Sequence, residues 1–415
     1  MDARTLRIAV GLGIGALAGL LLFAIGQQWF LAVALAAIVG QVVYAGLALK
    51  QTGEWGPMRF AAGLVAFAVV VYIGIVGFGD FGTGADVDPD TFVNAKAANT
   101  WALILTIAMV VGAVVYFGLE LLQTGRLDSL ARQFTTRTYL LMAVGIAVNI
   151  ILGQTVASAL KIPIYLDSIG TILVGVLCGP IAGALTGALG NILWSYVIPP
   201  PFQYQPAAAF AIVAVAIGVI AGLAGRAGFL RPRPGRSTAE LLVGGLVTVA
   251  LIGGMALAAV VGYRVILQTD VSLLPSTDGV DWYFIALAWL ALALVVAAVV
   301  GLFALLLIRR DLTAAYVVVA GVFTGVIAAL ISAPIAAGVF GGVTASGTDF
   351  LVAAFRQAGL DVQAATTGQG LISDPIDKVT TFFTVYLILQ AMANRFKARF
   401  PQGERVVAVE EGAAA

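Results

Sequence analysis

The sequence contains no histidine, a single cysteine and few charged residues, and each shortage excludes a kind of chemistry. Without histidine the chain has no imidazole general base, no imidazole metal ligand and no histidine pH switch. With Cys178 alone it has no intrachain disulfide and no thiolate metal cluster. Charged residues make up 10% of the chain and the net charge is +1, which gives no support to nucleic-acid binding. We therefore expect no catalytic residue, no metal site, no cofactor and no nucleic-acid partner.

The lysines also exclude a nucleotide-binding P-loop, in which a lysine directly follows a glycine. None of the lysines in this chain follows a glycine; they are Lys50, Lys96, Lys161, Lys378 and Lys397. We expect the protein to hydrolyse no nucleotide by that route and, more broadly, not to be an enzyme.

Hydrophobic residues are what the sequence has in excess. They account for 61% of the chain, and the mean hydropathy of +1.04 lies outside the range of soluble globular proteins. Several apolar runs reach the roughly 18 to 20 residues that cross a bilayer as a helix. The sequence therefore predicts an all-α polytopic protein of the cell membrane, with membrane lipid as a partner.

Twelve candidate spans lie between breaks that are charged or rich in proline and glycine. They fall near residues 7–25, 29–49, 60–79, 101–122, 138–159, 168–179, 181–197, 207–226, 239–263, 282–308, 313–339 and 376–394. The sixth and seventh spans are separated at Gly179 and Pro180, because Pro180 would break one long helix and suits the first turn of a new one.

The distribution of basic residues predicts the orientation of these spans, because cytoplasmic ends carry the excess of Lys and Arg. Seventeen basic residues fall on the side of the N-terminus: Arg4, Arg7, Lys50, Arg59, Arg126, Arg132, Arg137, Arg226, Arg231, Arg233, Arg236, Arg309, Arg310, Arg395, Lys397, Arg399 and Arg405. Five fall on the other side: Lys96, Lys161, Arg264, Arg356 and Lys378. We therefore expect both termini to be cytoplasmic.

A domain boundary is predicted in the stretch 123–137, which interrupts the hydrophobic runs with alternating charges. Residues 1–125 would form a four-helix N-terminal extension with hardly any polar residue inside its spans. After the boundary, polar residues occur inside and at the ends of the spans. Because a polar group in hydrocarbon must be paired or line a cavity, we expect the function to reside there.

The fifth span contains the segment AVGIAVNIILGQ, with Asn149 and Gln154 as its polar residues. Ala143 and Ala147 are four residues apart and form a small-residue face on which another helix can pack closely. Asn149 lies about 200° around the helix from Ala147, so it would point into its own bundle. Asn149 then either bonds to a neighbouring helix or binds a ligand.

Aromatic and polar residues collect at the external ends of the sixth and seventh spans. Asn191, Trp194 and Tyr196 precede a proline-rich segment that contains Tyr204. Aromatic residues at this depth are either membrane-interface residues or a stacking surface for a planar polar molecule. Asp167 similarly either caps the sixth span or presents its carboxylate to a ligand.

The segment 340–375 is long for a connection and is predicted to be a loop that closes over the site as a lid. Within it, Thr348 or Asp349 would cap a short amphipathic helix that carries Arg356. We include Asp349 and Arg356 among the candidate ligand-binding residues.

The lid segment ends in SDPIDK, which has the pattern of a helix start. Asp374 would be the N-cap, Pro375 the first helical residue and Asp377 the third, where a carboxylate suits the helix N-terminus. Lys378 would pair with these carboxylates and position the lid.

Four segments resemble the substrate-binding S component of energy-coupling factor (ECF) vitamin transporters. They are FTTRTYLLMAVGIAVNIILGQ, IPIYLDSIGTILVGVLCGPIAGALTGALGNILW, GGVTASGTDFLVAAFRQAG and LISDPIDKVTTFFTVYLIL. The resemblance covers residues 133–228 and 312–398, close to six spans. It implies a six-helix core that binds a vitamin or related small micronutrient and is driven by a separate T component and two ATPase subunits. It also implies that Ala143 and Ala147 contact the T component.

The chain departs from that family pattern in two places. The four helices of 1–125 precede the core, and a two-helix hairpin within 229–311 is inserted between its fourth and fifth spans. Residues 399–415 would form a cytoplasmic tail.

Two other classes of function remain open at this stage. A self-contained secondary transporter of a small polar solute would suit twelve spans with cytoplasmic termini, although the halves show no convincing internal similarity. A membrane enzyme or sensor module is weakened by the absence of histidine and of a sizeable cytoplasmic domain.

Overall fold

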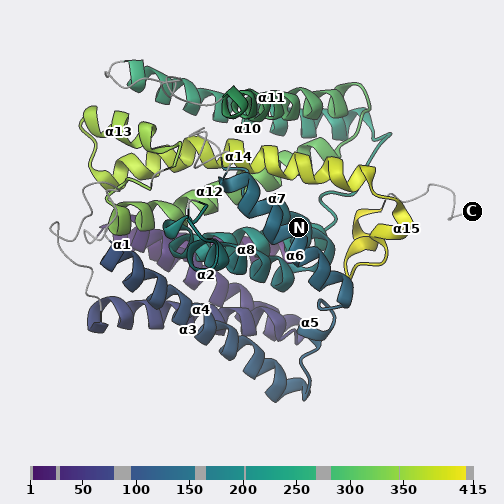
Figure 1. Cartoon of the computed structure of the whole chain (residues 1–415). Coiled ribbons are helices and arrows are strands. Elements are labelled where there is room, and N and C mark those ends of the chain that lie inside the picture. The colour runs from purple at the N-terminus through teal and green to yellow at the C-terminus, as the bar shows by residue number, and fades with distance from the viewer. Residues whose placement is uncertain are drawn as a thin grey trace, which may run out of the picture. The chain divides into compact units, whose positions relative to one another are not determined.

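The computed structural model describes residues 3–24, 29–78, 95–154, 165–200, 202–267, 282–344 and 346–407 of the chain. All regular secondary structure in these ranges is helical (Figure 1). Among them, six helices are long and apolar enough to cross a membrane, over Leu35–Thr52, Gly56–Gly77, Asn99–Thr124, Pro206–Arg226, Thr238–Ala258 and Thr313–Phe340. The prediction of a helical membrane protein is confirmed, and the number of twelve spans stays a prediction.

The chain divides into two compact units, with the division between Asp128 and Ser129. Unit 1 contains α1 (Ala3–Ala24), α2 (Trp29–Thr52), α3 (Gly56–Ile73) with the π-helical turn η1 (Gly74–Phe78), and α4 (Ala95–Thr124) from Asn99 onward. Within this unit α1 packs along α2, and the Arg59 guanidinium on α3 lies 3.6 Å from the Glu120 carboxylate on α4.

Unit 2 comprises Thr83–Ala98, with the first residues of α4, and Ser129–Ala415, which begins inside the short helix α5 (Asp128–Ala131) and contains the remaining helices. They are α6 (Thr136–Leu152), α7 (Ile169–Cys178), α8 (Pro180–Tyr196), η4 (Gln205–Phe210), α9 (Ala211–Arg226), α10 (Thr238–Leu267), α11 (Trp282–Leu307), α12 (Thr313–Phe340), α13 (Asp349–Gln357), α14 (Val362–Ala391), α15 (Asn394–Lys397) and η5 (Gly403–Val406).

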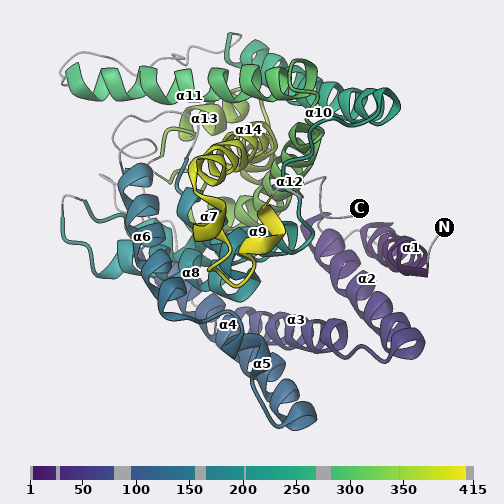
Figure 2. The same cartoon turned by 90° about the vertical axis from the view of Figure 1, so that its right-hand side faces the viewer.

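The core of unit 2 forms where α7 and α9 meet the helices around them (Figure 2). α7 packs against α6, α8 and α9, while α9 also contacts α12. α12 in turn packs along α14, and α10 and α11 each pack on α12 and α14. Helices from distant parts of the sequence, α6 to α9 and α12 with α14, therefore pack into one bundle.

The loop before α6 fixes the beginnings of two helices. The Thr135 hydroxyl caps α6 by accepting a hydrogen bond from the Thr138 amide. The Gln133 side-chain oxygen accepts hydrogen bonds from the backbone amides of Ile181 and Ala182, in the first turn of α8. These first-turn amides have no partner within their own helix, so Gln133 supplies the missing acceptor. Gly179 separates α7 from α8, as the sequence predicts.

The segment 340–375 is not one long loop, which corrects the sequence prediction. Its second half is already helical, because α14 begins at Val362 and is capped by the Asp361 carboxylate, which accepts a hydrogen bond from the Ala364 amide. Pro375 lies inside α14, where a membrane helix tolerates proline when packed neighbours compensate for the missing hydrogen bond. The short amphipathic helix that the sequence predicts is present as α13.

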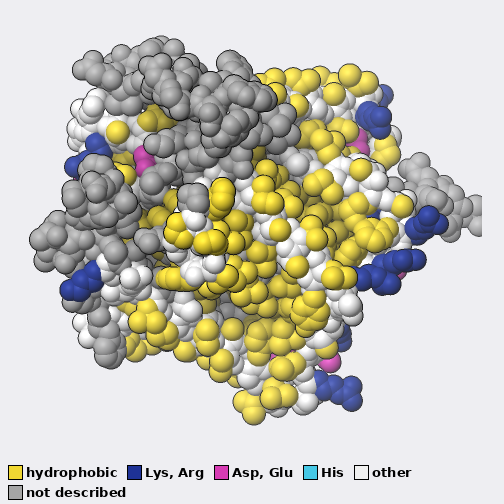
Figure 3. Space-filling view, in the orientation of Figure 1, with side chains coloured by type: hydrophobic (Ala, Val, Ile, Leu, Met, Phe, Trp, Pro, Cys, Tyr) yellow, Lys and Arg dark blue, Asp and Glu magenta, His cyan; other side chains and the backbone are white. Residues whose placement is uncertain are grey.

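Large hydrophobic side chains are exposed along the helices of both units. Examples are Leu12 and Val114 in unit 1 and Leu140, Leu246 and Phe323 in unit 2. In Figure 3 hydrophobic side chains (yellow) predominate on the visible described surface, with Lys and Arg (dark blue) toward its margins. An apolar surface of this extent requires a nonaqueous environment, which agrees with a membrane-embedded protein.

Candidate functional site

A pocket opens inside unit 2, between the two groups of helices that sequence reasoning assigned to the core. Its volume is about 100 Å³, well above the roughly 10 to 15 Å³ that one water molecule needs. Its lining combines polar, charged and aromatic side chains with an apolar floor: Asn149, Tyr165, Asp167, Ser168, Thr171, Asn191, Trp194, Tyr204, Ala207, Phe210, Val213, Ala214, Ile217, Ala328, Ser332, Thr344, Asp374 and Lys378.

One wall of the pocket carries a buried group of charges. Lys378 on α14 forms an ion pair with Asp377, lies 3.9 Å from the Asp167 carboxylate and donates a hydrogen bond of 2.9 Å to the Ser168 hydroxyl. Asp377 is completely buried, and its second oxygen accepts hydrogen bonds from the backbone amides of Tyr165 and Leu166. Asp377 therefore anchors the loop before α7 to α14, and with it Asp167.

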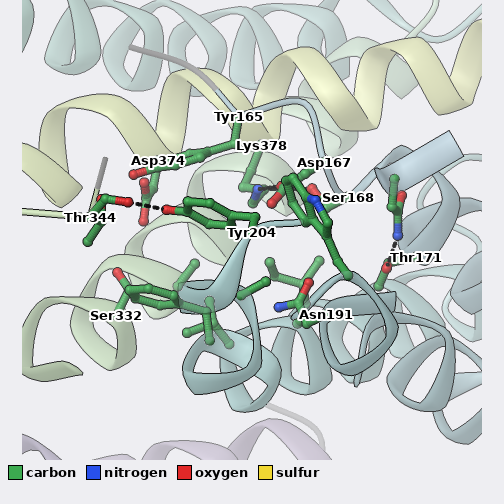
Figure 4. Close-up of a pocket in the computed structure, with 18 residues that line it drawn as sticks. Tyr165, Asp167, Ser168, Thr171, Asn191, Tyr204, Ser332, Thr344, Asp374 and Lys378 are labelled. Atoms are coloured by element: carbon green, nitrogen blue, oxygen red, sulfur yellow. Dashed lines mark hydrogen bonds and ion pairs between the residues drawn. The ribbon is translucent and has the colours of Figure 1, made fainter. Parts of the chain in front are cut away.

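Asp167 itself lies in that loop, with 30% of its side chain exposed. Burial raises the pKa of its carboxyl group, and the nearby Lys378 ammonium opposes this rise. Ser168, rather than Asp167, occupies the N-cap position of α7, so the capping interpretation of Asp167 does not apply. Its carboxylate faces the pocket instead (Figure 4).

The opposite wall comes from α8 and the segment after it (Figure 4). The Trp194 and Tyr204 rings pack together with centroids 5.0 Å apart. The Trp194 indole donates to the Phe202 carbonyl, and the Tyr204 hydroxyl donates to the Thr344 carbonyl at 2.5 Å. Both aromatic side chains are thus held in place by protein contacts and offer the pocket their apolar surfaces.

Asn149 and Asn191 both line the pocket but differ in their bonding. The Asn149 amide donates to the Thr171 hydroxyl and accepts from the Gly170 amide, both at 2.8 Å, so it joins α6 to α7. Asn191 makes no side-chain hydrogen bond to any residue within the described ranges. Asn149 fits the packing interpretation, whereas Asn191 has a full set of donors and acceptors available to a ligand.

A hydrogen-bonded loop connects the α12–α13 junction to the pocket. The Asp349 carboxylate accepts hydrogen bonds from the Thr344 amide and hydroxyl, and the Tyr165 and Thr348 hydroxyls are 2.7 Å apart. Ser346 bridges this network with hydroxyl contacts of 2.8 Å to Thr344 and 2.9 Å to Thr348. The network fixes the segment that holds Thr344 over Tyr204.

The pocket brings together five of the predicted ligand-binding residues: Asn149, Asp167, Asn191, Trp194 and Tyr204. Four others lie outside its lining. Asp349 bonds to its own loop, Tyr196 is 59% exposed and Arg356 is exposed on α13. The Gln154 side-chain oxygen is buried without a hydrogen-bond partner among the described residues.

The predicted capping role of Asp374 is wrong, because Asp374 lies inside α14, far beyond its N-cap at Asp361. For the same reason Asp377 does not occupy a first-turn position. Proline and aspartate commonly mark a helix start, which is why the sequence misleads here. Asp374 and Lys378 instead line the pocket, and Asp377 supports them from behind.

Sequence reasoning missed several polar pocket residues, namely Tyr165, Ser168, Thr171, Ser332 and Thr344. Two of them, Tyr165 and Ser168, lie beside Asp167 in the segment IPIYLDSIG, so the sequence offered a reason to include their hydroxyl groups in the site. Ser332 interrupts an apolar run, and an isolated polar residue in a membrane helix is a signal of function. Thr344 carried no such signal, because only the fold places it near Tyr204.

The small-residue face of α6 is exposed in unit 2. Ala143 and Ala147 are both solvent- or lipid-accessible, as are Tyr139, Leu140 and Val144 beside them. The opposite side of α6 carries the buried Asn149. This face is open to another helix or to lipid.

The fold and the pocket together define a class: a helical membrane protein with a buried, polar and aromatic pocket inside one helical bundle. Among the described residues no group of three or more Asp, Glu, Cys or His side chains is arranged to hold a metal ion. Comparisons with protein-family models, with curated proteins and with solved structures gave no match. The pocket is therefore the feature from which a function can be inferred.

Proposed function

We propose that the protein is a membrane-embedded substrate-binding subunit for the uptake of a vitamin or related small micronutrient, energised by separate ECF-type T and ATPase subunits. The observation that carries this proposal is the pocket of unit 2, lined by Asn191, Asp374 and the aromatic pair Trp194 and Tyr204. Polar groups placed inside a membrane bundle are costly unless they are paired or serve a substrate.

The composition of the pocket suits a small organic molecule better than an inorganic ion. Apolar and aromatic walls with a few convergent polar groups are typical of small-molecule sites. Aromatic faces can stack on a planar ring, while the Asn191 amide can both donate and accept hydrogen bonds. A polar heterocycle would use both features.

A partner surface for the T component is expected on α6. Ala143 and Ala147 give this exposed face a small-residue pattern, which allows close helix packing in a membrane. The assignment of this face to a T component follows the resemblance of the core. The four helices of unit 1, together with α10 and α11, are additions to the pattern of that family.

Small molecules retained by the purified full-length protein test the binding claim. Mass spectrometry of extracts should identify a retained compound for the wild type. Ser332→Phe should abolish its retention, because Ser332 lines the pocket and a phenyl ring would fill it. Ala250→Phe, which adds the same ring on an exposed position of α10, should retain the compound.

Two results would contradict the proposal. One is a folded wild-type protein that retains no small molecule and binds none from a metabolite mixture. The other is a retained compound that stays bound in a correctly folded Ser332→Phe variant.

A further inference from the structure

Among the described residues, the charges around the pocket do not balance. Three carboxylates, those of Asp167, Asp374 and Asp377, line or support it, and one ammonium group, that of Lys378, faces them. With all four groups ionised the formal charge is −2. Inside a bundle of low polarity such an excess is unfavourable, and either a bound proton or another positive charge relieves it.

Lys378 is already compensated by its neighbours. Its ammonium pairs with Asp377 and bonds to the Ser168 hydroxyl, and both Lys378 and Asp377 are almost completely buried. Asp377 uses its other oxygen to hold the backbone of the loop before α7. Lys378 and Asp377 therefore form an ion pair with a structural role, and together they add no net charge to the pocket.

Asp374 is the carboxylate that has no direct ion pair among the described residues. Its side chain lines the pocket and the residue is 7% exposed. Among the described residues its hydrogen-bond donor is Ser373, at 3.2 Å, and it forms no ion pair. A buried carboxylate with one neutral donor has unused acceptor capacity that points to a charged or strongly donating ligand group.

Asp167 adds a second negative group to the lining of the pocket. It is 3.9 Å from Lys378, whose charge it shares with Asp377. The Tyr204 and Trp194 rings line the same space. Aromatic faces beside carboxylates are a favourable environment for organic cations, because the ring faces are also negative.

We propose that the substrate of this site is an organic cation, with its positive group near Asp374 and Asp167 and its apolar or aromatic body against Trp194 and Tyr204. The inference rests on the proposed substrate-binding function and names the charge class of the substrate. A bound cation would reduce the formal charge from −2 to −1 and would occupy the unused oxygen of Asp374.

The test uses equilibrium dialysis of the purified full-length protein against a small-molecule cell extract, followed by mass spectrometry and sorting of bound compounds by their charge at neutral pH. The compound most enriched by the wild type should be a cation. Asp374→Asn and Asp167→Asn should each weaken its binding by about 10- to 100-fold, because each removes one attractive charge and keeps the side-chain shape. Using both variants keeps the test valid if one of them misfolds.

Asp361→Asn is the matched control. It makes the same substitution on the same helix but at the exposed N-cap, where asparagine also caps well. Its binding should equal that of the wild type. Enrichment of a neutral or anionic compound, or unchanged binding in both folded pocket variants, would overturn the cation assignment and leave the proposed function standing. Enrichment of no compound at all would overturn both.

Discussion

At the scale of single residues, two asparagines that line the pocket differ in role: the hydrogen bonds of Asn149 indicate a structural role, and those missing from Asn191 among the described residues favour a binding role. The Asn149 side chain bonds to both the Thr171 hydroxyl and the Gly170 amide, whereas the Asn191 side chain makes no hydrogen bond in the described part of the chain. Both are amides in predicted membrane spans, so the sequence alone does not distinguish them. Their hydrogen-bond partners distinguish them.

We predict that Asn149→Ala destabilises the protein and that Asn191→Ala weakens ligand binding. Removal of Asn149 leaves the buried Gly170 amide unpaired, at a cost of about 1 to 3 kcal/mol. Asn191→Ala should leave the melting temperature nearly unchanged and raise the dissociation constant about five- to a hundred-fold. Thermal unfolding of the ligand-free protein and calorimetry with the retained compound measure the two effects.

The opposite pattern would contradict this assignment: a lower melting temperature for Asn191→Ala together with unchanged affinity. Trp194→Ala would be a poorer test. Its ring packs on Tyr204, and a side chain at Gly153 would lie only 2.5 Å from it, so the residue is also part of the packing. Its removal should therefore lower stability and affinity together.

The residue types of the site could be predicted from sequence, but their bonding could not. Asn191, which interrupts an apolar run, and Asp167, at the end of one, both line the pocket, and their binding of a ligand stays a prediction. The environment of Asp374 depends on α14 continuing through Pro375, which is set by packing between helices. Local sequence favoured a helix start there.

At the scale of elements, the contact between α12 and α14 places the charged wall of the pocket. A side chain at Gly325 on α12 would come within 2.5 Å of the Pro375 backbone on α14. The glycine therefore allows α14 to approach where proline has removed one backbone amide. Asp374 and Lys378 reach the pocket from this crossing.

We predict that Gly325→Ala separates α12 from α14 and destabilises the protein by about 1 to 3 kcal/mol, as overpacking of a close contact does. Gly338→Ala is the control on the same helix, since a Cβ there meets no atom within 4 Å. The control should be neutral or stabilising by up to about 1 kcal/mol, because alanine favours helix over glycine. Thermal unfolding in one detergent compares them. Equal melting temperatures for the two variants would argue against a close α12–α14 contact.

At the scale of the whole molecule, composition determined the class and hydrophobic runs located the helices. Each of the twelve predicted segments overlaps a described helix, and six of the described helices are long and apolar enough to cross a membrane. Boundaries were less accurate, as the early start of α14 shows. Polar residues at a helix end do not reveal whether the helix stops or continues as a packed, amphipathic segment.

The predicted orientation can be tested by labelling of single cysteines in a Cys178→Ala background. Cys178 is fully buried, so its loss should remove little reactivity from the surface. Gln357→Cys, exposed on α13, should react with an impermeant thiol reagent in intact cells, and Ser237→Cys should react only after the cells are permeabilised. Reaction of Ser237→Cys in intact cells would exclude cytoplasmic termini with twelve spans.

The most direct measurement of the central claim is uptake of an isotope-labelled small-molecule extract by cells that express the chain with or without ECF-type T and ATPase subunits. We predict that the compound retained by the purified protein accumulates only when those subunits are present and ATP is available. We also predict that this uptake persists when the proton gradient is collapsed at constant ATP. Accumulation by the chain alone, lost on collapse of the proton gradient and retained without ATP, would contradict the account and identify a secondary transporter.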